Sequence, residues 1–536
     1  MKKSKKYSSL RNLPIAMLLG FSLTFISSTI SARDKNVDKA ISDLVSTIQT
    51  PIIPNRTINL CQFSGHTADE TGSYDFQDDI RRAIDSLSVK GGGTLLFTHT
   101  RGVDTWVKQT EIYRIKGPII LKSNIELKFQ PNVKLSLEFA PVSYLPNGKP
   151  VLTRYEGTSV YTYCPLIYAF NCSNIAITVT GGNGAMPVLD GNGEKWQKWA
   201  DQGDWRLISK GLLPTFKMLR NEGMFNAKDT PIAERICADT SVNFLRPPLM
   251  QFIHCQKIKV EGVKLVNSPF WVVHPVFTTD FTLRNVMYDC QVVNNDGVDI
   301  ESSSRVLIEN VTFDNHDDNV VIKSGRDREG REGALVAGTE YEKINSPFVK
   351  NGRITAPTSD VVVRNCAFKG HYAFCVGSEI AGGAHNLYVT DCTSPMEVMM
   401  GVFLKSNRKR GGEVKDIYVQ NLNFQNIKFD AICIIPNYDN DTASPYPTHF
   451  RNISISNIKV ETAGIGIRIF GWEDAPIRNV RLQNINIEKV ANTNPDKLLL
   501  INQVENVQLK NVKINNVKYN GKFNKLEKNV FPPKQN

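Results

Sequence analysis

Short runs of alternating apolar and polar residues recur along most of the chain, and Asn or Asp commonly ends a run. Alternation with a period of two is typical of a strand with one buried face. The runs that begin at 281 and 306 are 25 residues apart, and those at 453, 480 and 507 are 27 apart. Repetition at this period, without helices, predicts stacked coils that bury one face on each other. Examples are Ser173–Val179, Phe281–Val286, Val306–Val311, Ile453–Ile458, Val480–Ile485 and Val507–Val512.

This pattern predicts an all-β fold, a right-handed, single-stranded parallel β-helix over residues 55–520. Asn at one phase of successive coils would stack as a ladder of side-chain hydrogen bonds. Residues 58–63 and 94–97 are expected strands. Apolar residues at 76, 80, 83, 84 and 87 form a helical stripe, and a helix over 76–87 with Asp75 as N-cap would cap the N-terminal end.

Two long excursions interrupt the repeat, at residues 194–245 and 326–358. The first contains Trp196, Trp199 and Trp205. Long loops of a repeat protein often wall a binding groove, but they also cover exposed coil edges, and the sequence does not separate these alternatives. Residues 33–54 are expected to be a leader or linker, and residues 521–536 a poorly ordered tail.

The N-terminal residues have the pattern of a signal peptide. Four lysines and Arg11 precede an apolar stretch over residues 13–26, and Ala32 ends a plausible cleavage site. The apolar stretch is short for a membrane span. Residues 1–32 therefore predict export to the periplasm or the outside of a bacterial cell, without a membrane anchor.

Charge and cysteine content narrow the classes of partner. The formal net charge of +11 falls to +6 without residues 1–32, which suits an acidic polymer, although solubility explains it as well. No Lys/Arg run is interleaved with aromatic residues, which argues against nucleic acid. None of the ten cysteines has CxxC spacing, which argues against a zinc or redox site. Cys255, Cys290 and Cys366 fall at apolar strand positions and are expected in the core.

The candidate chemistry lies between residues 293 and 325, which contain Asp296 and the adjacent pair Asp317 and Asp318. Hydrolysis of a glycosidic bond needs one carboxylic acid and one carboxylate. Two adjacent aspartates cannot both ionise cheaply, so one of them is expected to have a raised pKa. Successive strand residues face opposite ways, so the chain must bend for both to line one cleft. A solvated turn is the alternative interpretation of these residues.

A series of motifs in fixed order then indicates a family, because the sequence resembles glycoside hydrolase family 28, the polygalacturonases and their relatives. The block from Gly370 to Gly383, followed by Arg410-Gly-Gly412, is most like the bacterial exo-acting members. The motifs that carry the resemblance are Asp190–Gly193, Ser268–Trp271, Asn294–Asp296, Asp317–Asp318, Ile322–Gly325, Gly370–His371, Gly377–Glu379 and Lys405.

The resemblance implies roles for individual residues. Asp317 matches the general acid, and Asp296 and Asp318 match the carboxylates that activate water in an inverting mechanism. His371 matches the histidine that supports protonation of the acid. Asn294 and Lys405 match residues that contact the substrate. No metal or organic cofactor is implied.

Three positions depart from the family pattern. Asn295 stands where Thr is usual, Tyr372 where Gly is usual, and Phe403 where the usual motif has Arg. Phe cannot grip a uronate carboxylate as Arg does. Arg408 or Arg410 is the expected substitute.

The resulting hypothesis is a monomeric, exported hydrolase that cleaves α-linked galacturonosyl bonds of acidic pectic polysaccharides from chain ends. One alternative is a hydrolase of a branched pectin, rhamnogalacturonan or xylogalacturonan. A second is a Ca²⁺-dependent polysaccharide lyase on the same fold, which would need several converging oxygen ligands. A third is a non-catalytic binding protein whose excursion tryptophans stack on sugars.

Overall fold

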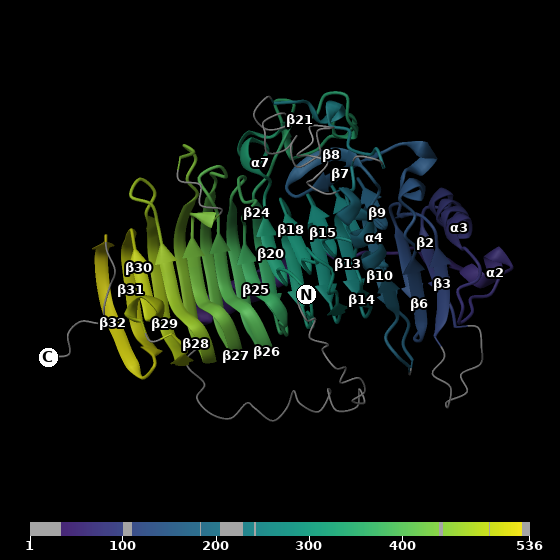
Figure 1. The fold of residues 1–536 in the computed structure, drawn as a ribbon. Helices are drawn as coiled ribbons and strands as arrows, with labels where there is room; N and C mark the ends of the chain where they lie inside the picture. Colours follow the sequence, from purple (N-terminus) through teal and green to yellow (C-terminus); the bar gives the residue numbers. More distant parts are fainter. Residues whose placement is uncertain are drawn as a thin grey trace, which may run out of the picture.

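The computed structural model describes residues 34–99, 110–182, 184–203, 229–240, 243–438, 443–492 and 494–527. Its strands form one long stack of coils, with β1 at one end and β32 at the other (Figure 1). Neighbouring coils pair in parallel register, as where Phe281 lies opposite Val306. The chain is therefore a parallel β-helix, as the repeat predicted.

Three rows of short strands form the walls of the first coils. The first row is β1 (Thr57–Asn59), β2 (Gly93–Phe97), β5 (Ile125–Phe129), β10 (Ser173–Val179), β13 (Gln256–Glu261), β16 (Thr279–Arg284), β19 (Ser304–Glu309) and β24 (Thr358–Arg364). The second is β4 (Ile119–Ile120), β9 (Ile167–Phe170), β12 (Met250–Ile253), β15 (Val273–Val276), β18 (Val298–Glu301), β20 (Val320–Lys323) and β25 (Gly370–Val376). The third is β3 (Glu111–Ile115), β6 (Val133–Leu137), β11 (Val188–Asp190), β14 (Lys264–Val266) and β17 (Met287–Asp289).

The C-terminal coils have longer strands that bend through more than one wall. They are β26 (Ala384–Lys405), β27 (Glu413–Ile435), β28 (His449–Phe470), β29 (Ile477–Val490) and β31 (Val504–Ile514), and the short β30 (Leu499–Asn502) precedes β31. An antiparallel strand, β32 (Val517–Leu526), pairs with β31 and covers the last coil. The prediction that the chain is poorly ordered after residue 520 is therefore wrong up to residue 526, and residues 528–536 lie outside the described part.

Asparagine ladders connect the turns of the coils, as predicted. Asn484 donates its side-chain amide to Asn457 at 3.0 Å, and Asn511 donates to Asn484 at 3.1 Å. These residues have φ between 52° and 56°, a left-handed conformation that Asn tolerates well. The same residue type thus makes the turn and ties it to the next coil.

The interior of the stack is one continuous apolar core. Its residues come from the inward face of every strand, so each coil buries apolar surface on its neighbours. Cys255, Cys290 and Cys366 lie within it, which confirms their prediction as core residues. All ten cysteines are free thiols.

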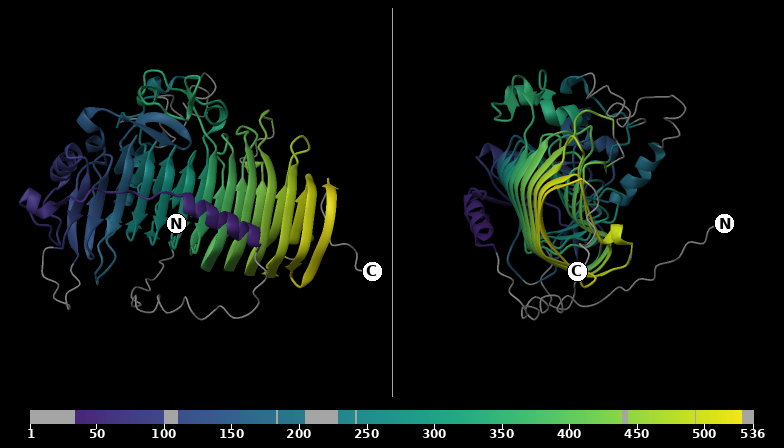
Figure 2. Two further views of the ribbon diagram at one scale, coloured as in Figure 1. Left: turned by 180° about the vertical axis from the view of Figure 1, so that it is seen from behind. Right: turned by 90° about the vertical axis from the view of Figure 1, so that its left-hand side faces the viewer.

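The N-terminal segment differs from the predicted leader or linker. Residues 35–47 form helix α1 (Lys35–Thr47), whose Val37 and Ile41 pack against Leu307 and Val362 on the outside of the coils. Figure 2 shows α1 lying across the strands from behind. The expected signal peptide, residues 1–32, lies outside the described residues.

The N-terminal end is capped by two helices, α2 (Leu60–Ser64) and α3 (Gln77–Val89). Helix α3 confirms the predicted capping helix, but its N-cap is Phe76 and not the predicted Asp75, whose carboxylate accepts a hydrogen bond from the Gln77 amide. The predicted strand over 58–63 is wrong beyond residue 59. Asn59 caps α2 there through a hydrogen bond from the Gln62 amide.

The elements β7, β8, α7 and β21 lie together on one side of the stack (Figure 1). A hairpin of β7 (Val151–Tyr155) and β8 (Thr158–Thr162) was not predicted. The segments of the two predicted excursions with regular structure are α4 (Gly193–Ala200), η4 (Asp201–Gly203), η5 (Ile232–Glu234), α7 (Asp327–Glu332), β21 (Ala334–Leu335), η6 (Glu340–Lys343), β22 (Val349–Lys350) and β23 (Arg353–Ile354). Short helical turns η2 (Pro141–Tyr144) and η3 (Pro146–Gly148) precede β7, and α8 (Pro495–Leu498) precedes β30.

Two of the three tryptophans in the first excursion are core residues. Trp196 and Trp199 are buried and pack edge-to-face on each other. They therefore do not offer open faces to a sugar, as the binding-protein alternative required, and Trp205 lies outside the described residues. Within the described residues, no helix is long and apolar enough to cross a membrane.

Candidate active site

One cavity of about 260 Å³ lies where the second row of strands meets the excursions. Its lining is predominantly charged. The acidic lining residues are Glu156, Asp296, Asp317, Asp318 and Glu379, the basic ones are Lys323, Arg326, Lys405 and Arg410, and the others are Phe270, Trp271, Asn294, Ser378 and Tyr438. Asp296, Asp317, Asp318, Asn294, Lys405 and Arg410 were all predicted as site residues, and the fold brings them together.

The register of the coils places two of the aspartates one above the other. Strand β18 pairs with β20 so that Val298 lies opposite Val320. Asp296 and Asp318 each stand two residues before these partners, and the Gly297 amide donates to the Asp318 carbonyl at 2.8 Å. Adjacent coils are about 4.8 Å apart, so the two carboxyl groups are neighbours.

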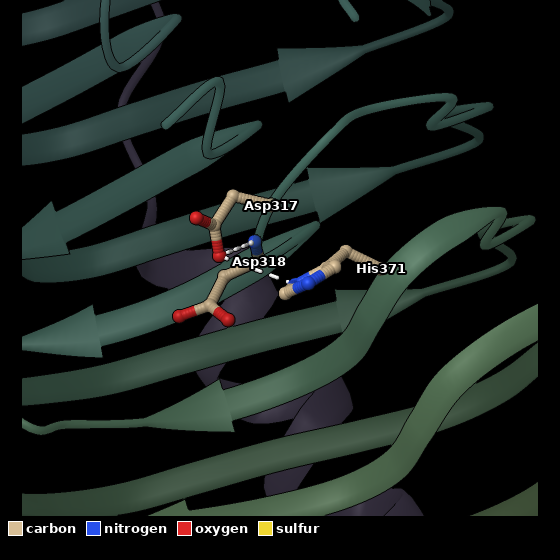
Figure 3. Close-up of side chains that lie close together, drawn as sticks. All are labelled: Asp317, Asp318 and His371. Carbon is tan, nitrogen blue, oxygen red and sulfur yellow. Dashed lines mark hydrogen bonds and ion pairs between the residues drawn. The ribbon is translucent and has the colours of Figure 1, made fainter. Parts of the chain in front are cut away.

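Asp317 and Asp318 reach the same cavity because the chain bends before β20, as predicted. The Asp318 amide donates to Asp317 Oδ1 at 3.0 Å, which holds the bend. His371, at the start of β25, brings its Nδ1 to 3.3 Å from Asp317 Oδ1. Figure 3 shows the three side chains converging from two neighbouring coils. His371 therefore contacts Asp317 from beside the cavity.

The pKa shifts of the aspartates differ from the expectation for the adjacent pair. Burial favours the neutral form of Asp317, but the His371 imidazole and the charges of Lys405 and Lys323 outweigh it and lower its pKa. At Asp296, burial and the nearby Asp299 and Asp317 carboxylates raise the pKa well above its ordinary value. The lowered pKa of Asp317 is the opposite of what its predicted role as the acid requires, and His371 lowers this pKa rather than supporting protonation as predicted.

Lys405 ends β26 and forms a buried ion pair with Asp318. Its Nζ lies 2.9 Å from Asp318 Oδ2 and 3.2 Å from Oδ1. The aromatic rings of Tyr372, Phe403 and Tyr438 surround the ammonium group, with centroids 4.9, 5.2 and 5.4 Å away. The ammonium is thus held by one carboxylate and by three ring faces.

A glycine fixes the backbone next to Lys405. Gly377 has φ of 92°, and a Cβ atom there would lie 1.9 Å from the Lys405 carbonyl oxygen. Only glycine allows that approach between the end of β25 and the end of β26. The position of Lys405 in the cavity therefore depends on Gly377.

Lys323 and Glu379 line the cavity but were not predicted as site residues. Lys323 Nζ lies 3.2 Å from Glu379 Oε2, 3.6 Å from Asp296 Oδ2 and 4.1 Å from the centroid of the Trp271 ring. Burial favours the neutral form of Glu379, but Lys323, Arg326 and Arg410 lower its pKa well below the usual value. Both residues belong to motifs that supported the resemblance, which is the signal that could have found them.

Of the two arginines predicted to bind substrate, Arg410 lines the cavity and Arg408 does not. Arg410 lines the cavity and donates from Nε to the Ser378 carbonyl at 3.1 Å. Arg408 does not line it, because its guanidinium binds Asp474 through two hydrogen bonds of 2.8 and 2.7 Å. Asn294 lines the cavity and accepts a hydrogen bond from Arg246 at 2.9 Å. Arg410 is therefore the better placed of the two arginines to contact a ligand.

Part of the cavity wall comes from the excursions. Glu156 lies at the tip of the β7–β8 hairpin, and Arg326 precedes α7. The Arg326 amide donates to the Gly157 carbonyl at 2.9 Å, which joins the second excursion to the hairpin. Arg154 anchors the hairpin through buried ion pairs with Glu301, at 2.7 Å, and with Glu329 of α7. The wall is thus fixed to the coils.

Three side chains of the site could bind a metal ion. One possible ligand atom each of Asp317, Asp318 and His371 lies within 4.8 Å of the others. However, Ca²⁺ prefers six to eight oxygen ligands. The Lys405 ammonium already neutralises Asp318, and a dication at this point would be repelled by it. The charge arrangement therefore favours acid–base chemistry over a Ca²⁺ site.

Comparisons with known proteins agree with the site. The family model of glycosyl hydrolases family 28 matches residues 223–494, just over half of the chain. A probable polygalacturonase of Vitis vinifera is 24% identical over 387 residues, which cover 70% of this chain and 65% of that protein. A polygalacturonase of Cochliobolus carbonum is 25% identical over 39% of this chain and 52% of its own length. The chain thus spans less than two thirds of these curated relatives.

Solved structures with the same fold include enzymes of this kind. A hyperthermoactive exopolygalacturonase from Thermotoga maritima has a TM-score of 0.72 and 29% identity, over 93% of this chain and 100% of that one. A family 28 exopolygalacturonase of Yersinia enterocolitica has a TM-score of 0.57 over 82% of this chain and 72% of its own, and at 18% identity it shows the fold alone.

Proposed function

The chain belongs to glycosyl hydrolases family 28, and from this premise we propose that it hydrolyses α-linked galacturonosyl bonds of pectic polysaccharides. The observation that carries the proposal is the convergence of Asp296, Asp317 and Asp318 on one cavity beside two lysine ammonium groups. Carboxyl groups supply the acid and base of glycoside hydrolysis. The cations suit a substrate that carries uronate charges.

In the proposed mechanism, Asp317 protonates the leaving glycosidic oxygen, and Asp296 and Asp318 activate the attacking water on the opposite side of the sugar. The bond from the anomeric carbon to the leaving oxygen breaks as water adds to that carbon, so the configuration inverts. His371 orients Asp317 through the 3.3 Å contact. Lys405 orients Asp318 through the ion pair at 2.9 Å.

An acid must hold its proton, whereas His371, Lys405 and Lys323 lower the pKa of Asp317. We propose that bound substrate raises the pKa of Asp317. A bound uronate brings negative charge close to Lys405 and Lys323 and excludes water, and both effects raise the pKa of a neighbouring carboxyl. The acid is then protonated only when it is needed.

Cleavage from chain ends is supported by the wall that the excursions provide. Glu156 of the β7–β8 hairpin and Arg326 of the second excursion line the cavity, and these two segments are anchored to each other and to the coils. A wall of this kind limits how far a polymer extends beyond the cut bond. The Thermotoga maritima exopolygalacturonase, similar over 93% of this chain, supports the same proposal.

A branched pectin, rhamnogalacturonan or xylogalacturonan, is a second candidate substrate, and Phe403 favours it. Phe403 stands where the family's usual motif has Arg, and its ring packs against Tyr372 at 5.3 Å. It offers no hydrogen bond to a carboxylate. The sugar on that side of the cut bond would then be neutral, while Arg326 and Arg410 bind uronate elsewhere in the cavity.

We also propose that the protein is exported, through residues 1–32, and acts as a monomer outside the cytoplasm. The proposal rests on the signal-peptide pattern and on a substrate that bacterial cells meet outside their membrane. Fusion of residues 1–32 to a reporter would direct the reporter out of the cell, and retention of the reporter in the cytoplasm would overturn the proposal.

Product analysis on polygalacturonate, rhamnogalacturonan and xylogalacturonan tests the proposed function. We expect reducing ends without near-ultraviolet absorbance, with monomeric galacturonate first if polygalacturonate is cut from its ends. Absorbing, unsaturated products would indicate a lyase. Inactivity on all three polymers would remove the pectin assignment.

A further inference from the structure

A fourth aspartate lies directly behind the cavity. Asp299, on β18, is fully buried and does not line the cavity. No donor in the described parts of the chain forms a hydrogen bond with either of its oxygens. Its closest cation is Lys323, with Nζ 3.5 Å from Oδ1. A buried carboxyl without a donor is costly unless it is neutral or shares a proton.

The charges around Lys323 do not balance if every carboxyl is ionised. Three buried carboxyl groups, Asp296, Asp299 and Glu379, face this one ammonium group at 3.2–3.6 Å. Glu379 has two further cations, Arg326 at 2.7 Å and Arg410 at 3.5 Å. The uncompensated charge therefore falls on Asp296 and Asp299, which interact directly with each other. Two buried carboxyls in contact retain one proton between them.

We propose that Asp299 is a positioning residue that keeps this proton and donates a hydrogen bond to the Asp296 carboxylate. The proposal rests on the proposed function, in which Asp296 must be ionised to take a proton from water. A neutral Asp299 donates a hydrogen bond that stabilises the ionised Asp296, and it does not place a second negative charge beside it. A carboxyl kept neutral by a buried site can act as such a donor.

The proton balance of the reaction is then complete. Asp299 keeps its proton throughout. The attacking water transfers a proton to Asp296 as its oxygen bonds to the anomeric carbon, and Asp317 transfers its proton to the leaving oxygen. Release of the Asp296 proton to solvent and protonation of Asp317 from solvent restore the site.

The groups that face Asp299 come from several elements. They are Asp296 in the turn before β18, Glu301 on β18, Asp318 and Lys323 before and on β20, and Tyr288 on β17. Burial raises the pKa of Asp299 well above the usual value, and Asp318 and Glu301 add to this, whereas Lys323 and the contact with the Asp296 carboxyl group oppose it. Because the folded protein then holds a proton that the unfolded chain releases, this contribution to stability is lost as the pH rises through the folded pKa.

Two variants of the full chain test the proposal. Asn retains a donor at position 299, so Asp299→Asn should keep kcat on the active pectic polymer within about threefold of wild type. Leu has similar volume and no donor, so Asp299→Leu should lower kcat about 100-fold with little change in KM. Asp280→Asn, which removes a buried carboxylate that pairs with Arg305 away from the cavity, is the control for stability. It should leave kcat unchanged.

A second measurement does not need activity. Thermal unfolding between pH 4 and pH 8 should show that Asp299→Asn takes up about one proton fewer on folding than wild type. The proposal is overturned if Asp299→Asn is as inactive as Asp299→Leu, if Asp299→Leu matches wild type, or if the unfolding profiles of wild type and Asp299→Asn coincide. Wild type that is inactive on every pectic polymer but shows the extra proton would instead overturn the proposed function.

Discussion

The C-terminal coils and the coils around the cavity stack in the same way but fill their stacked polar positions with different groups. In the C-terminal coils, Asn484 bonds to Asn457 and Asn511 at 3.0 and 3.1 Å. An amide both donates and accepts, so such a ladder satisfies itself. At the cavity, Asp296 and Asp318 are stacked instead, and ionised carboxylates only accept.

The difference shows that stacked carboxylates need compensation of their negative charge, which stacked amides do not need. Lys323 and Lys405 provide positive charge at the ends of their strands, and a retained proton supplies the remainder. The regular coils need no such partners. The predictions below compare the two regions, from the largest expected effect to the smallest.

Removal of the proposed acid should give the largest effect. Asp317→Asn should lower kcat by about 10²–10⁴, because general acid catalysis contributes that much, and should leave unfolding little changed. Reducing-end release measures the rate. The matched control is Asp314→Asn, an exposed aspartate three residues earlier, which should keep full activity. Equal losses in both variants would contradict the assignment.

Breaking the buried ion pair of Lys405 should cost more than breaking an exposed pair. Lys405→Met leaves Asp318 buried without its cation, so the free energy of unfolding should fall by about 3–5 kcal/mol, with loss of activity. Lys459→Met removes an exposed pair with Glu488 and should cost less than about 1 kcal/mol. Chemical denaturation measures both. Similar small losses would show that Lys405 does not balance the stacked aspartates.

A methyl group at Gly377 should disturb the cavity but not the stack as a whole. Gly377→Ala has to move the Lys405 carbonyl or the β25 backbone and adopt φ near 92°, so it should cost about 1–3 kcal/mol and reduce activity. Gly352→Ala is the control, because φ there is 72° and nothing lies within 4 Å of the added Cβ. If the two variants lose the same stability and keep activity, the close approach to Lys405 is unimportant.

The pH dependence should differ between the free enzyme and the complex. His371, Lys405 and Lys323 lower the pKa of Asp317 in the free enzyme, and the proposed effect of substrate charge is to raise it, so the protonated acid should persist to higher pH in the complex. The profile of kcat should therefore fall at higher pH than that of kcat/KM, since the two report the complex and the free enzyme respectively. Coincident basic limbs would contradict a substrate-induced shift.

The amide ladder should be the least sensitive feature. Asn484→Ala removes two ladder hydrogen bonds and should cost about 1–2 kcal/mol without changing kcat. Asn516→Ala, at an exposed turn residue with φ of 67°, is a control for the left-handed conformation alone. A loss of activity in Asn484→Ala would show that the two regions are not independent.

Sequence periodicity was sufficient to predict the coils, because the contacts that stabilise each coil recur in the next one. The alternating runs, the ladder and the bend at Asp317 and Asp318 all follow from local pattern. Helix α1 was missed although Val37, Ile41, Leu44, Val45 and Ile48 form an apolar stripe of helical period. This stripe is visible in the sequence and is sufficient to predict the helix.

Other features depend on contacts that no local pattern contains. Arg154 of the unpredicted hairpin pairs with Glu301, which is 147 positions later in the chain. The lowered pKa of Asp317 and the raised pKa of Asp296 depend on Lys323, Lys405 and Asp299, which belong to three strands. Such charge interactions can be predicted only once the register of the coils is known.

The stereochemical course of hydrolysis tests the acid–base assignment most directly. Fresh product from the wild-type enzyme acting on polygalacturonate, or on whichever pectic polymer it cuts, can be followed by proton NMR before the anomers equilibrate. Water attack opposite the bond that Asp317 protonates predicts the β anomer as the first product. An initial α anomer, or an unsaturated end, would contradict the account.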